Sequence, residues 1–412
     1  MHSTSKEASP FGAPPRLNVI GLGPSGAILA LRAAARGWDV HGFDPAASDQ
    51  PGTSKQPSTT ASELPDWPAT YGVFEPEIPR WARIFFSTPV NLQVITAPGR
   101  SQTLGFRYCM LDPQPLREAT EAAITIHPSL IQDSAALPGI TVDCRGAVVI
   151  PGALWQLAVG IVVPFSDANP PELETPTFMD WRAPADSDVG APPSFCYIQQ
   201  IKDGWLVEET ILATTDKPNG LTDPIFDELR TRLKQRINRT FGGSPEFVRR
   251  LHANWSDLRE EIVAIPMGTR QSAAKSSSPI FGARAGFIHP ATGYSIGTAL
   301  QEVERFLDDL TPQLSKRRGG SWFVFDATLA QVLRRLGSLL IADADRATLQ
   351  DFFRCFFALS TRQQLDYLSG RSGVRTMTTM WALRKKTGWR HPFLRPLFRH
   401  PVRYIRAALR FS

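Results

Sequence analysis

The sequence predicts a mixed α/β protein of two or three lobes, organised around a β-α-β unit near its N-terminus. Its 412 residues are more than one hydrophobic core usually organises. With 42% hydrophobic and 20% charged residues, the composition excludes a disordered or fibrous chain. The first 50 residues show the third observation, a short apolar strand pattern on either side of one helical pattern.

The N-terminal unit begins with a predicted strand over residues 16–20. A helix rich in Ala and Leu follows over residues 25–36, and Gly37 stands where a glycine commonly ends a helix. The second strand covers residues 39–43. Together these segments give the strand-helix-strand order of a dinucleotide-binding unit.

The turn between the first strand and the helix carries the motif G-x-G-x-x-G. Gly21 makes the tight turn, Gly23 lets the backbone approach a pyrophosphate, and Gly26 permits close packing of helix on strand. The helix N-terminus then faces the phosphates, and an acidic residue ending the second strand can accept from ribose hydroxyls. We expect cofactor contacts from Gly21, Gly23, Pro24, Ser25, Gly26 and Asp44.

Beyond this unit, proline-rich runs over 45–70 and 166–194 predict two long loops. Residues 195–200 and 205–212 predict a hairpin turning at 202–204. Further strands are predicted over 84–86, 92–95 and 139–144 and as a pair within 148–163, and helices over 224–247 and from 302 onward.

Charge is unevenly distributed along the chain. Residues 371–412 hold 11 Lys or Arg and no acidic residue, so the remaining 370 carry 34 basic and 39 acidic side chains. A mildly acidic body with a basic tail argues against nucleic acid as a partner. The four cysteines are far apart and the histidines lack metal-ligand spacing, so we expect no metal site and a reducing cytoplasm.

Membrane and secretion signals are weak. The N-terminal residues show no signal-peptide pattern. The charge-free stretch 146–165 is interrupted by Pro151 and Gly152 near its start and by Gly160 and Pro164 near its end. It therefore predicts strands rather than a transmembrane helix.

A second glycine-rich turn, over residues 285–297, precedes another helical stretch. Its helix N-terminus would present backbone N–H groups to a ligand, as a late turn does beside the flavin in many flavoproteins. Two such turns at opposite ends of a chain favour FAD over NAD. The expected cofactor contacts of the second turn are Gly286, Pro290, Gly293 and Tyr294.

Two adjacent carboxylates, Glu208 and Glu209, stand in an otherwise apolar strand. Alternation sends them to opposite faces, so at most one can enter a given cavity. A carboxyl walled by apolar groups has a raised pKa and can act as an acid near neutrality. The alternative is that one faces solvent and the other pairs with an arginine. His289 is the histidine within the late turn and is a further candidate.

These motifs resemble the flavoprotein lycopene β-cyclases of carotenoid biosynthesis, over about residues 16–371. The matching segments, in chain order, are 19–26 (V-I-G-L-G-P-S-G), 71–74 (Y-G-V-F), 155–160 (W-Q-L-A-V-G), 178–182 (F-M-D-W-R), 206–210 (L-V-E-E-T), 265–268 (I-P-M-G), 286–294, 352–357 and 368–371.

The resemblance implies a glutathione-reductase-like FAD-binding Rossmann fold with an inserted β-sheet substrate domain and a helical C-terminal region. We expect the FAD-binding domain to comprise 1–72, 100–150 and 262–312. The β-sheet domain would comprise 73–99 and 151–261, and the helical region 313–412.

The implied reaction cyclises the linear ends of lycopene to β-ionone rings without net redox change. FAD would be held reduced by NAD(P)H, and its anionic ring would stabilise a carbocation. Glu208 matches the first Glu of the family strand and is the preferred acid/base, with Glu209 second and His289 as a relay or shaping residue. Asp180, Trp181 and Arg182 match M-D-W-R, and we expect them to orient the site.

The resemblance also implies partners and a location. Lycopene resides in the bilayer, so the basic tail, with aromatic and aliphatic residues between its arginines, is predicted to lie on an anionic membrane surface. We expect a cytoplasmic, peripherally bound protein that can meet other carotenoid-pathway enzymes. Two alternatives stay open: an FAD-dependent monooxygenase or prenyl-chain reductase of the same fold, and a protein that stores a carotenoid or flavin.

Overall fold

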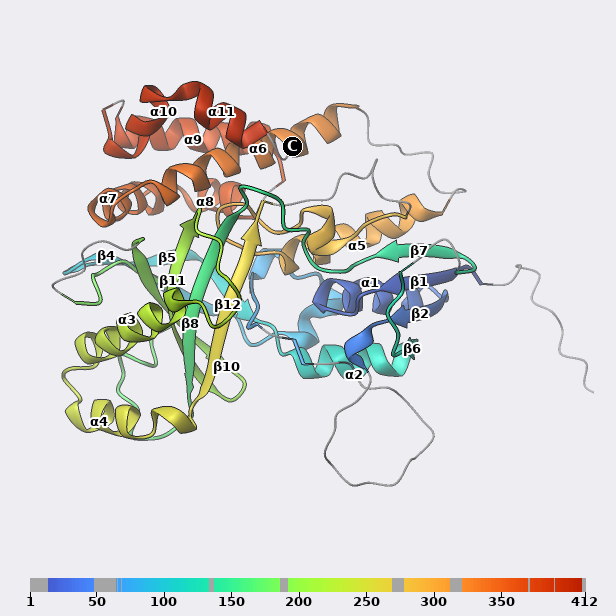
Figure 1. Ribbon diagram of the computed structural model, residues 1–412, viewed down its shortest axis with the longest axis horizontal. Helices are drawn as coiled ribbons and strands as arrows, with labels where there is room; N and C mark the ends of the chain where they lie inside the picture. Colours follow the sequence, from blue (N-terminus) through green and yellow to red (C-terminus); the bar gives the residue numbers. More distant parts are fainter. Residues whose placement is uncertain are drawn as a thin grey trace, which may run out of the picture.

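Two β-sheets and a helical lobe make up the chain in the computed structural model (Figure 1). The structure describes residues 14–47, 64, 66–67, 69–132, 137–185, 192–268, 278–311, 321–369, 371–388 and 390–409, with the backbone alone for 321–325. Most of the predicted loop 45–70, residues 186–191 of the second loop and Trp389 of the tail lie outside these ranges.

The first sheet is parallel and has the strand order β6-β2-β1-β7. Helix α1 runs between β1 and β2 as the sequence predicts, and it packs against α2 and α5. This confirms a mixed α/β protein with a Rossmann-like parallel sheet. The bounds are β1 Arg16–Ile20, α1 Pro24–Ala35, β2 Asp39–Phe43, α2 Pro113–Ala123, β6 Thr125–His127, β7 Ile140–Asp143 and α5 Ile296–Leu310.

The second sheet has eight strands in the order β12-β8-β11-β10-β9-β4-β5-β3, all antiparallel neighbours except β4 and β9. The predicted hairpin is β10 and β11. Helix α3 packs on β8 and β11, and α4 follows it. The bounds are β3 Gly72–Phe74, β4 Val90–Ala97, β5 Arg100–Met110, β8 Leu154–Val163, β9 Thr177–Asp180, β10 Ser194–Ile201, β11 Gly204–Thr214, α3 Pro224–Thr240, α4 Pro245–Ala253 and β12 Arg259–Met267.

The C-terminal helices form a lobe at the top of the view in Figure 1. Helix α6 packs on β11, α7 on β4 and α8 on β5, so the lobe is seated on the second sheet. The helices are α6 Ser321–Ala342, α7 Arg346–Phe357, α8 Thr361–Leu368, α9 Gly373–Thr387, α10 Arg395–Arg399 and α11 Pro401–Leu409. They confirm the predicted helical region.

Two strand predictions are wrong. Residues 84–86 lie in and after a 3-10 helix, Arg80–Phe85, where Ala82 and Phe85 are buried and Ile84 is 77% exposed, a spacing of three residues. The stretch 148–163 forms one strand, β8, instead of two. Its turn, at residues 151–152, comes before that strand, and Gly160 does not interrupt it.

Two of the predicted domain limits also need correction. Residues 100–110 form β5, which pairs with β4 through a tight turn at Gly99, where φ is +69°. They therefore belong to the second sheet and not with the first. Residues 262–267 likewise continue β12 of the second sheet. The other limits remain predictions.

Candidate active site

A cavity of about 710 Å³ lies where the two sheets meet. The carboxyl ends of β1 and β2 bound it on one side, and β8, β11 and β12 bound it on the other. Residues 292–296, at the start of α5, supply a third wall. Ligands of open α/β sheets bind at the carboxyl ends of the strands, which is the position of this cavity.

The glycine turn after β1 faces the cavity. Gly21 has φ +90°, and a β-carbon there would lie 2.9 Å from the backbone nitrogen of Arg145. A β-carbon on Gly26 would lie 2.0 Å from the Gly21 carbonyl oxygen, so Gly26 allows α1 to pack on the turn. At Gly23 a β-carbon would meet nothing within 4 Å, and this N-cap has no side chain to cap α1. The turn thus leaves its helix N-terminus open to an anion.

Asp44 braces this turn. Its Oδ2 atom accepts from the backbone N–H of Leu22 at 2.8 Å, and its Oδ1 atom accepts from Ala46 at 3.0 Å. Of the residues expected to bind the cofactor, Gly26 lies behind the cavity wall. Those that line the cavity are Gly21, Gly23, Pro24, Ser25 and Asp44.

The second half of the late turn, from residue 292 onward, lines the cavity. The N–H of His289 donates to the Tyr294 carbonyl at 2.7 Å, and Gly293 has φ +76° with Gln156 at its back. Gly293 and Tyr294 line the cavity. Gly286 and Pro290 do not line it.

Both of these residues shape the turn instead. Gly286 ends a short 3-10 helix with φ +80°, and its carbonyl accepts from Gln331 at 3.3 Å. Pro290 packs against Gly268, where a β-carbon would lie 3.2 Å from the proline ring.

Glu208 is the carboxyl that faces the cavity. Burial, and next the charge of Glu261, raise its pKa to about 8. The hydroxyl of Thr210 donates to its Oε1 atom at 2.5 Å. A carboxyl in this setting holds its proton at neutral pH and can act as a general acid.

Glu209 points the other way, toward α3, and is fully buried. It accepts from Arg236 at 2.9 and 3.1 Å and from the Ser194 hydroxyl at 2.6 Å. The prediction that alternation separates the two glutamates is confirmed, and Glu209 is the one that pairs with an arginine. Glu209 does not line the cavity, so it has no direct access to a ligand there.

Glu261 is a cavity residue that the sequence interpretation missed. It belongs to β12, next to Glu260, which faces outward and pairs with Arg230. The signal was present, because Glu260-Glu261 repeats the adjacent-glutamate pattern of Glu208 and Glu209. Alternation alone would have sent one member of each pair to each face.

A family model described as lycopene cyclase protein matches residues 109–383, about two thirds of the chain. The chain belongs to the lycopene cyclase family. The matched range includes both cavity glutamates and the late turn, while the first glycine turn precedes it.

Relatives of this family extend the match. An uncharacterized carotenoid cyclase of Deinococcus radiodurans is 28% identical over 408 residues, covering 90% of each chain. Lycopene beta cyclase of Synechococcus elongatus is 25% identical over 395 residues, covering 85% of this chain and 88% of that protein. A solved geranylgeranyl bacteriochlorophyll reductase-like protein of Thermoplasma acidophilum has a TM-score of 0.56 at 12% identity, covering 94% of this chain and 99% of that one. That structure shares the fold.

In this lycopene cyclase family member, the M-D-W-R segment lies behind the cavity. Asp180 accepts from Arg182 at 2.6 and 2.9 Å, and Arg236 donates to the Arg182 carbonyl at 2.5 Å. Because Arg236 also holds Glu209, the segment and that glutamate form one network on the α3 side. Trp181 is fully buried among aromatic rings. None of the three predicted orienting residues lines the cavity.

His289 ties the late turn to the helical lobe. Its Nδ1 atom accepts from the Ala291 N–H at 3.1 Å, and Nε2 therefore donates to the Tyr367 carbonyl at 2.9 Å. Burial lowers the pKa of His289 well below its ordinary value. Both ring nitrogens are thus occupied in the neutral form, and the ring does not line the cavity.

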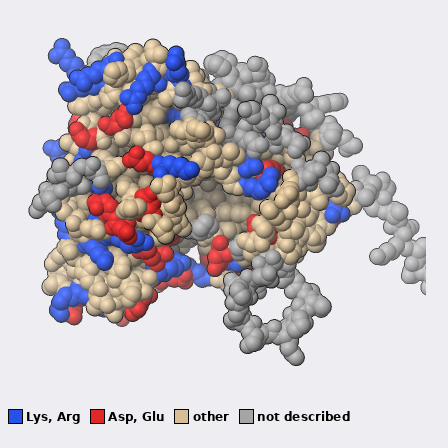
Figure 2. Space-filling view, in the orientation of Figure 1, with Lys and Arg blue, Asp and Glu red and all other residues tan. Residues whose placement is uncertain are grey.

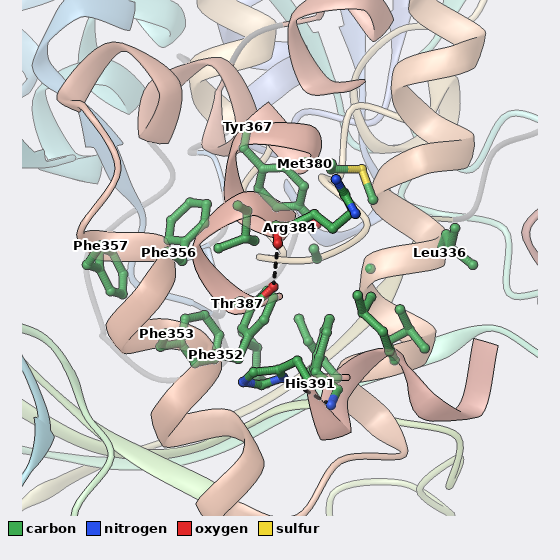
Figure 3. A pocket seen from close by; sticks show the side chains of 18 of the residues that line it. Leu336, Phe352, Phe353, Phe356, Phe357, Tyr367, Met380, Arg384, Thr387 and His391 are labelled. Atoms are coloured by element: carbon green, nitrogen blue, oxygen red, sulfur yellow. Dashed lines mark hydrogen bonds between the residues drawn. The ribbon is translucent and has the colours of Figure 1, made fainter. Parts of the chain in front are cut away.

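A second pocket, about 90 Å³ and almost wholly apolar, lies among the C-terminal helices (Figure 3). Phenylalanines of α7 form one side, and Leu336 of α6 stands opposite them. The lining also includes Met380, Arg384 and Thr387 of α9. Thr292 lines both this pocket and the main cavity, so the late turn borders both spaces.

The tail is amphipathic in part. Figure 2 shows Lys and Arg gathered over the C-terminal helices at the top of the view. Of the apolar tail residues expected at a surface, Phe393 and Tyr404 are instead buried, at 5% and 3% exposed, because they pack into the lobe. The exposed apolar side chains, defined here as the apolar tail face, are Val374, Met377, Trp381, Phe398, Val402, Ile405 and Leu409. Among the described residues, every helix is too short or too polar to span a bilayer.

Proposed function

We propose that this protein is a lycopene β-cyclase, which converts the linear ends of lycopene to β-ionone rings and yields γ-carotene and β-carotene. The observation that carries the proposal is Glu208, a carboxyl on the cavity wall with a pKa of about 8. Cyclisation needs a proton donor and no electron transfer, and Glu208 supplies such a donor. The names of the relatives support the same class of substrate.

The proton step uses this chain's own side chains. Because the Thr210 hydroxyl donates to Oε1 of Glu208, Oε1 acts as an acceptor and Oε2 is left to carry the proton. That proton adds to the terminal double bond, the neighbouring alkene closes the ring onto the cation, and a ring proton returns to Glu208. Protons and electrons balance without an oxidant. Apolar wall residues such as Leu206 and Phe195 exclude water from the cation.

The cavity fits a dinucleotide. The uncapped N-terminus of α1, the open side of Gly23 and the neighbouring Ser25 form a cradle for a pyrophosphate, with Asp44 beside it. We propose FAD as the group held there, with Gly293 and Tyr294 at its other end, in a glutathione-reductase-like arrangement. When bound, FAD kept reduced by NAD(P)H would supply negative charge near the site.

The proposal also includes a membrane surface as partner. The apolar tail face carries large side chains such as Trp381, with Arg384 stacked on its ring at 4.1 Å, a combination that suits a lipid headgroup region. Helix α9 also contributes to the lining of the apolar pocket. A polyene leaving the bilayer there would meet the apolar lining of this pocket, and Thr292 lies between this pocket and the main cavity.

Pigment analysis tests the function. Bacteria that accumulate lycopene and produce the wild-type chain should convert it to γ- or β-carotene. We expect Glu208→Gln to lower the yield at least about 100-fold, since it removes the general acid, while the purified variant keeps its FAD.

Glu260→Gln is the matched control, because it changes the same kind of residue on the outward face of β12 and should leave the yield unchanged. Unconverted lycopene with the wild-type chain would overturn the proposal. NAD(P)H consumed in proportion to product would identify a monooxygenase or reductase instead, and unchanged bound carotenoid would identify a storage protein.

A further inference from the structure

One row of residues across the cavity face of the second sheet carries two carboxylates. Glu208 on β11 and Glu261 on β12 are both in register with Gly160 of β8, the strand between them. Both line the cavity. Adjacent strands lie about 4.8 Å apart, so the two backbones are about 10 Å from each other. The glutamate side chains therefore flank the same glycine.

Gly160 keeps the space between these carboxylates open. A β-carbon at this position would lie 2.8 Å from Cδ1 of Leu206 and 3.2 Å from Cβ of Glu208. Any larger residue would displace the Leu206 side chain and crowd the Cβ atom of Glu208. Because glycine stands here, no side chain of β8 separates Glu208 from Glu261.

Glu261 is held as an acceptor at both oxygens. The backbone N–H of Thr70 donates to its Oε1 atom at 2.7 Å, and the Thr70 hydroxyl donates to its Oε2 atom at 2.6 Å. These two donors hold the carboxylate group in one orientation. The arrangement fixes a negative charge beside the cavity.

Within the described part of the chain, no cation neutralises this charge. Neither Glu208 nor Glu261 forms an ion pair there. Arg145 also lines the cavity, but its guanidinium pairs with Asp143 at 2.8 Å. The two cavity glutamates therefore share one row of the sheet without an arginine or lysine partner among the described residues.

We propose that Glu261 is a positioning residue for the proton: its fixed negative charge, facing Glu208 across Gly160, keeps Glu208 protonated until an alkene accepts the proton. This inference rests on the proposed function. It assigns a different role to each glutamate: Glu261 carries the negative charge, and Glu208 carries the proton.

The other titratable groups around Glu208 leave this role to Glu261. Tyr71, Tyr197 of β10 and Tyr294 of the late turn are phenols whose pKa values are raised, mainly by burial, so all three stay neutral. Glu209, the neighbour on the same strand, lies on the opposite face and pairs with Arg236.

The pH dependence of cyclisation by purified protein in lycopene-loaded vesicles tests the proposal. Glu208 is active when protonated, so activity falls as the pH rises through its pKa. Glu261→Gln removes the like charge and lowers that pKa. The part of the pH–activity profile in which activity falls, the descending limb, should therefore move to lower pH by about one unit.

Two variants separate charge from structure. Glu260→Gln removes one negative charge from the same strand on its outer face, and Thr70→Ala removes a hydrogen bond to Glu261 but keeps its charge. Both should leave the limb in place. If Glu261→Gln leaves the limb unmoved, or if Thr70→Ala moves it equally, the proposal is overturned.

Infrared difference spectroscopy keeps this test separate from the proposed function. The carboxylic-acid band that Glu208→Gln abolishes reports the protonation of Glu208 whether or not the protein cyclises lycopene. In Glu261→Gln that band should disappear at a pH about one unit lower than in the wild type. A band that titrates at the same pH in both proteins refutes the inference, even if carotenes are formed.

Discussion

The two faces of strands β11 and β12 place the same residue type in opposite surroundings. Each strand carries two adjacent glutamates, and pleating sends one to each face. On the α3 face, Glu209 and Glu260 are neutralised by Arg236 and Arg230. On the cavity face, the described residues offer Glu208 and Glu261 only hydroxyl and backbone donors.

The two faces of the sheet therefore differ in what surrounds their carboxyl groups. A buried carboxylate paired with an arginine is a fixed structural charge. Glu208, which has no such partner, has a raised pKa and keeps its proton near neutral pH. Helix α3 supplies the arginines, so the face that it covers is structural. The face that it leaves open is available for a ligand.

The largest expected effect is on the structural face. Arg236→Met should lower the free energy of unfolding by about 3 to 5 kcal/mol, because it leaves Glu209 buried without its partner. Denaturant unfolding of the purified variant measures this. Arg230→Met is the matched control on the same helix.

The Arg230–Glu260 pair is half-buried, with both side chains 28% exposed. Its loss should therefore cost only about 1 kcal/mol or less. Equal losses from the two arginine variants would show that burial does not distinguish these pairs.

The next effect is on the cavity face and concerns pH. The pKa of Glu208 is raised from 4.5 in an ordinary setting to about 8 in the folded chain. Its proton therefore stabilises the folded state fully below about pH 4.5, and that contribution is lost as the pH rises through about 8. Glu208→Gln should remove about 2 to 4 kcal/mol of pH-dependent stability across this range. Unfolding curves of both proteins at several pH values provide the measurement, and parallel pH profiles would contradict it.

The smallest expected effect concerns the space that Gly160 leaves between Glu208 and Glu261. Gly160→Ala places a methyl group 3.2 Å from Cβ of Glu208, which should shift this side chain and reduce cyclisation about tenfold. Thermal unfolding should change little, since the neighbouring Leu206 side chain can move. Full activity in Gly160→Ala would show that the open space is not needed.

Much of this difference between the two faces can be predicted from the sequence, because side chains alternate between the faces of a strand from one residue to the next. It predicts that Glu208 and Glu209 lie on opposite faces, and the glycine turn predicts the cradle at α1. The same rule could have found β5, where Leu104, Phe106 and Tyr108 are buried and alternate with exposed positions.

Register between distant strands could not be predicted. That Glu261 stands beside Gly160 depends on which residues of β8 and β12 pair, and the sequence of either strand alone does not determine this. The arginine that pairs with Glu209 could not be identified from the sequence either. Arg236 lies on helix α3, and which of its residues meet the sheet depends on how that helix packs. The apolar pocket likewise needs α6, α7 and α9 brought together.

The backbone around Trp181 has one further consequence. Its buried carbonyl accepts from Arg346 and Gln350 of α7, and Arg346 also donates to the Ser194 carbonyl of β10 at 2.7 Å. Without α7, these carbonyls would lose their donors. We therefore expect the helical lobe to unfold together with the second sheet, and a chain shortened before α7 to lose part of the support for the sheet that carries Glu208.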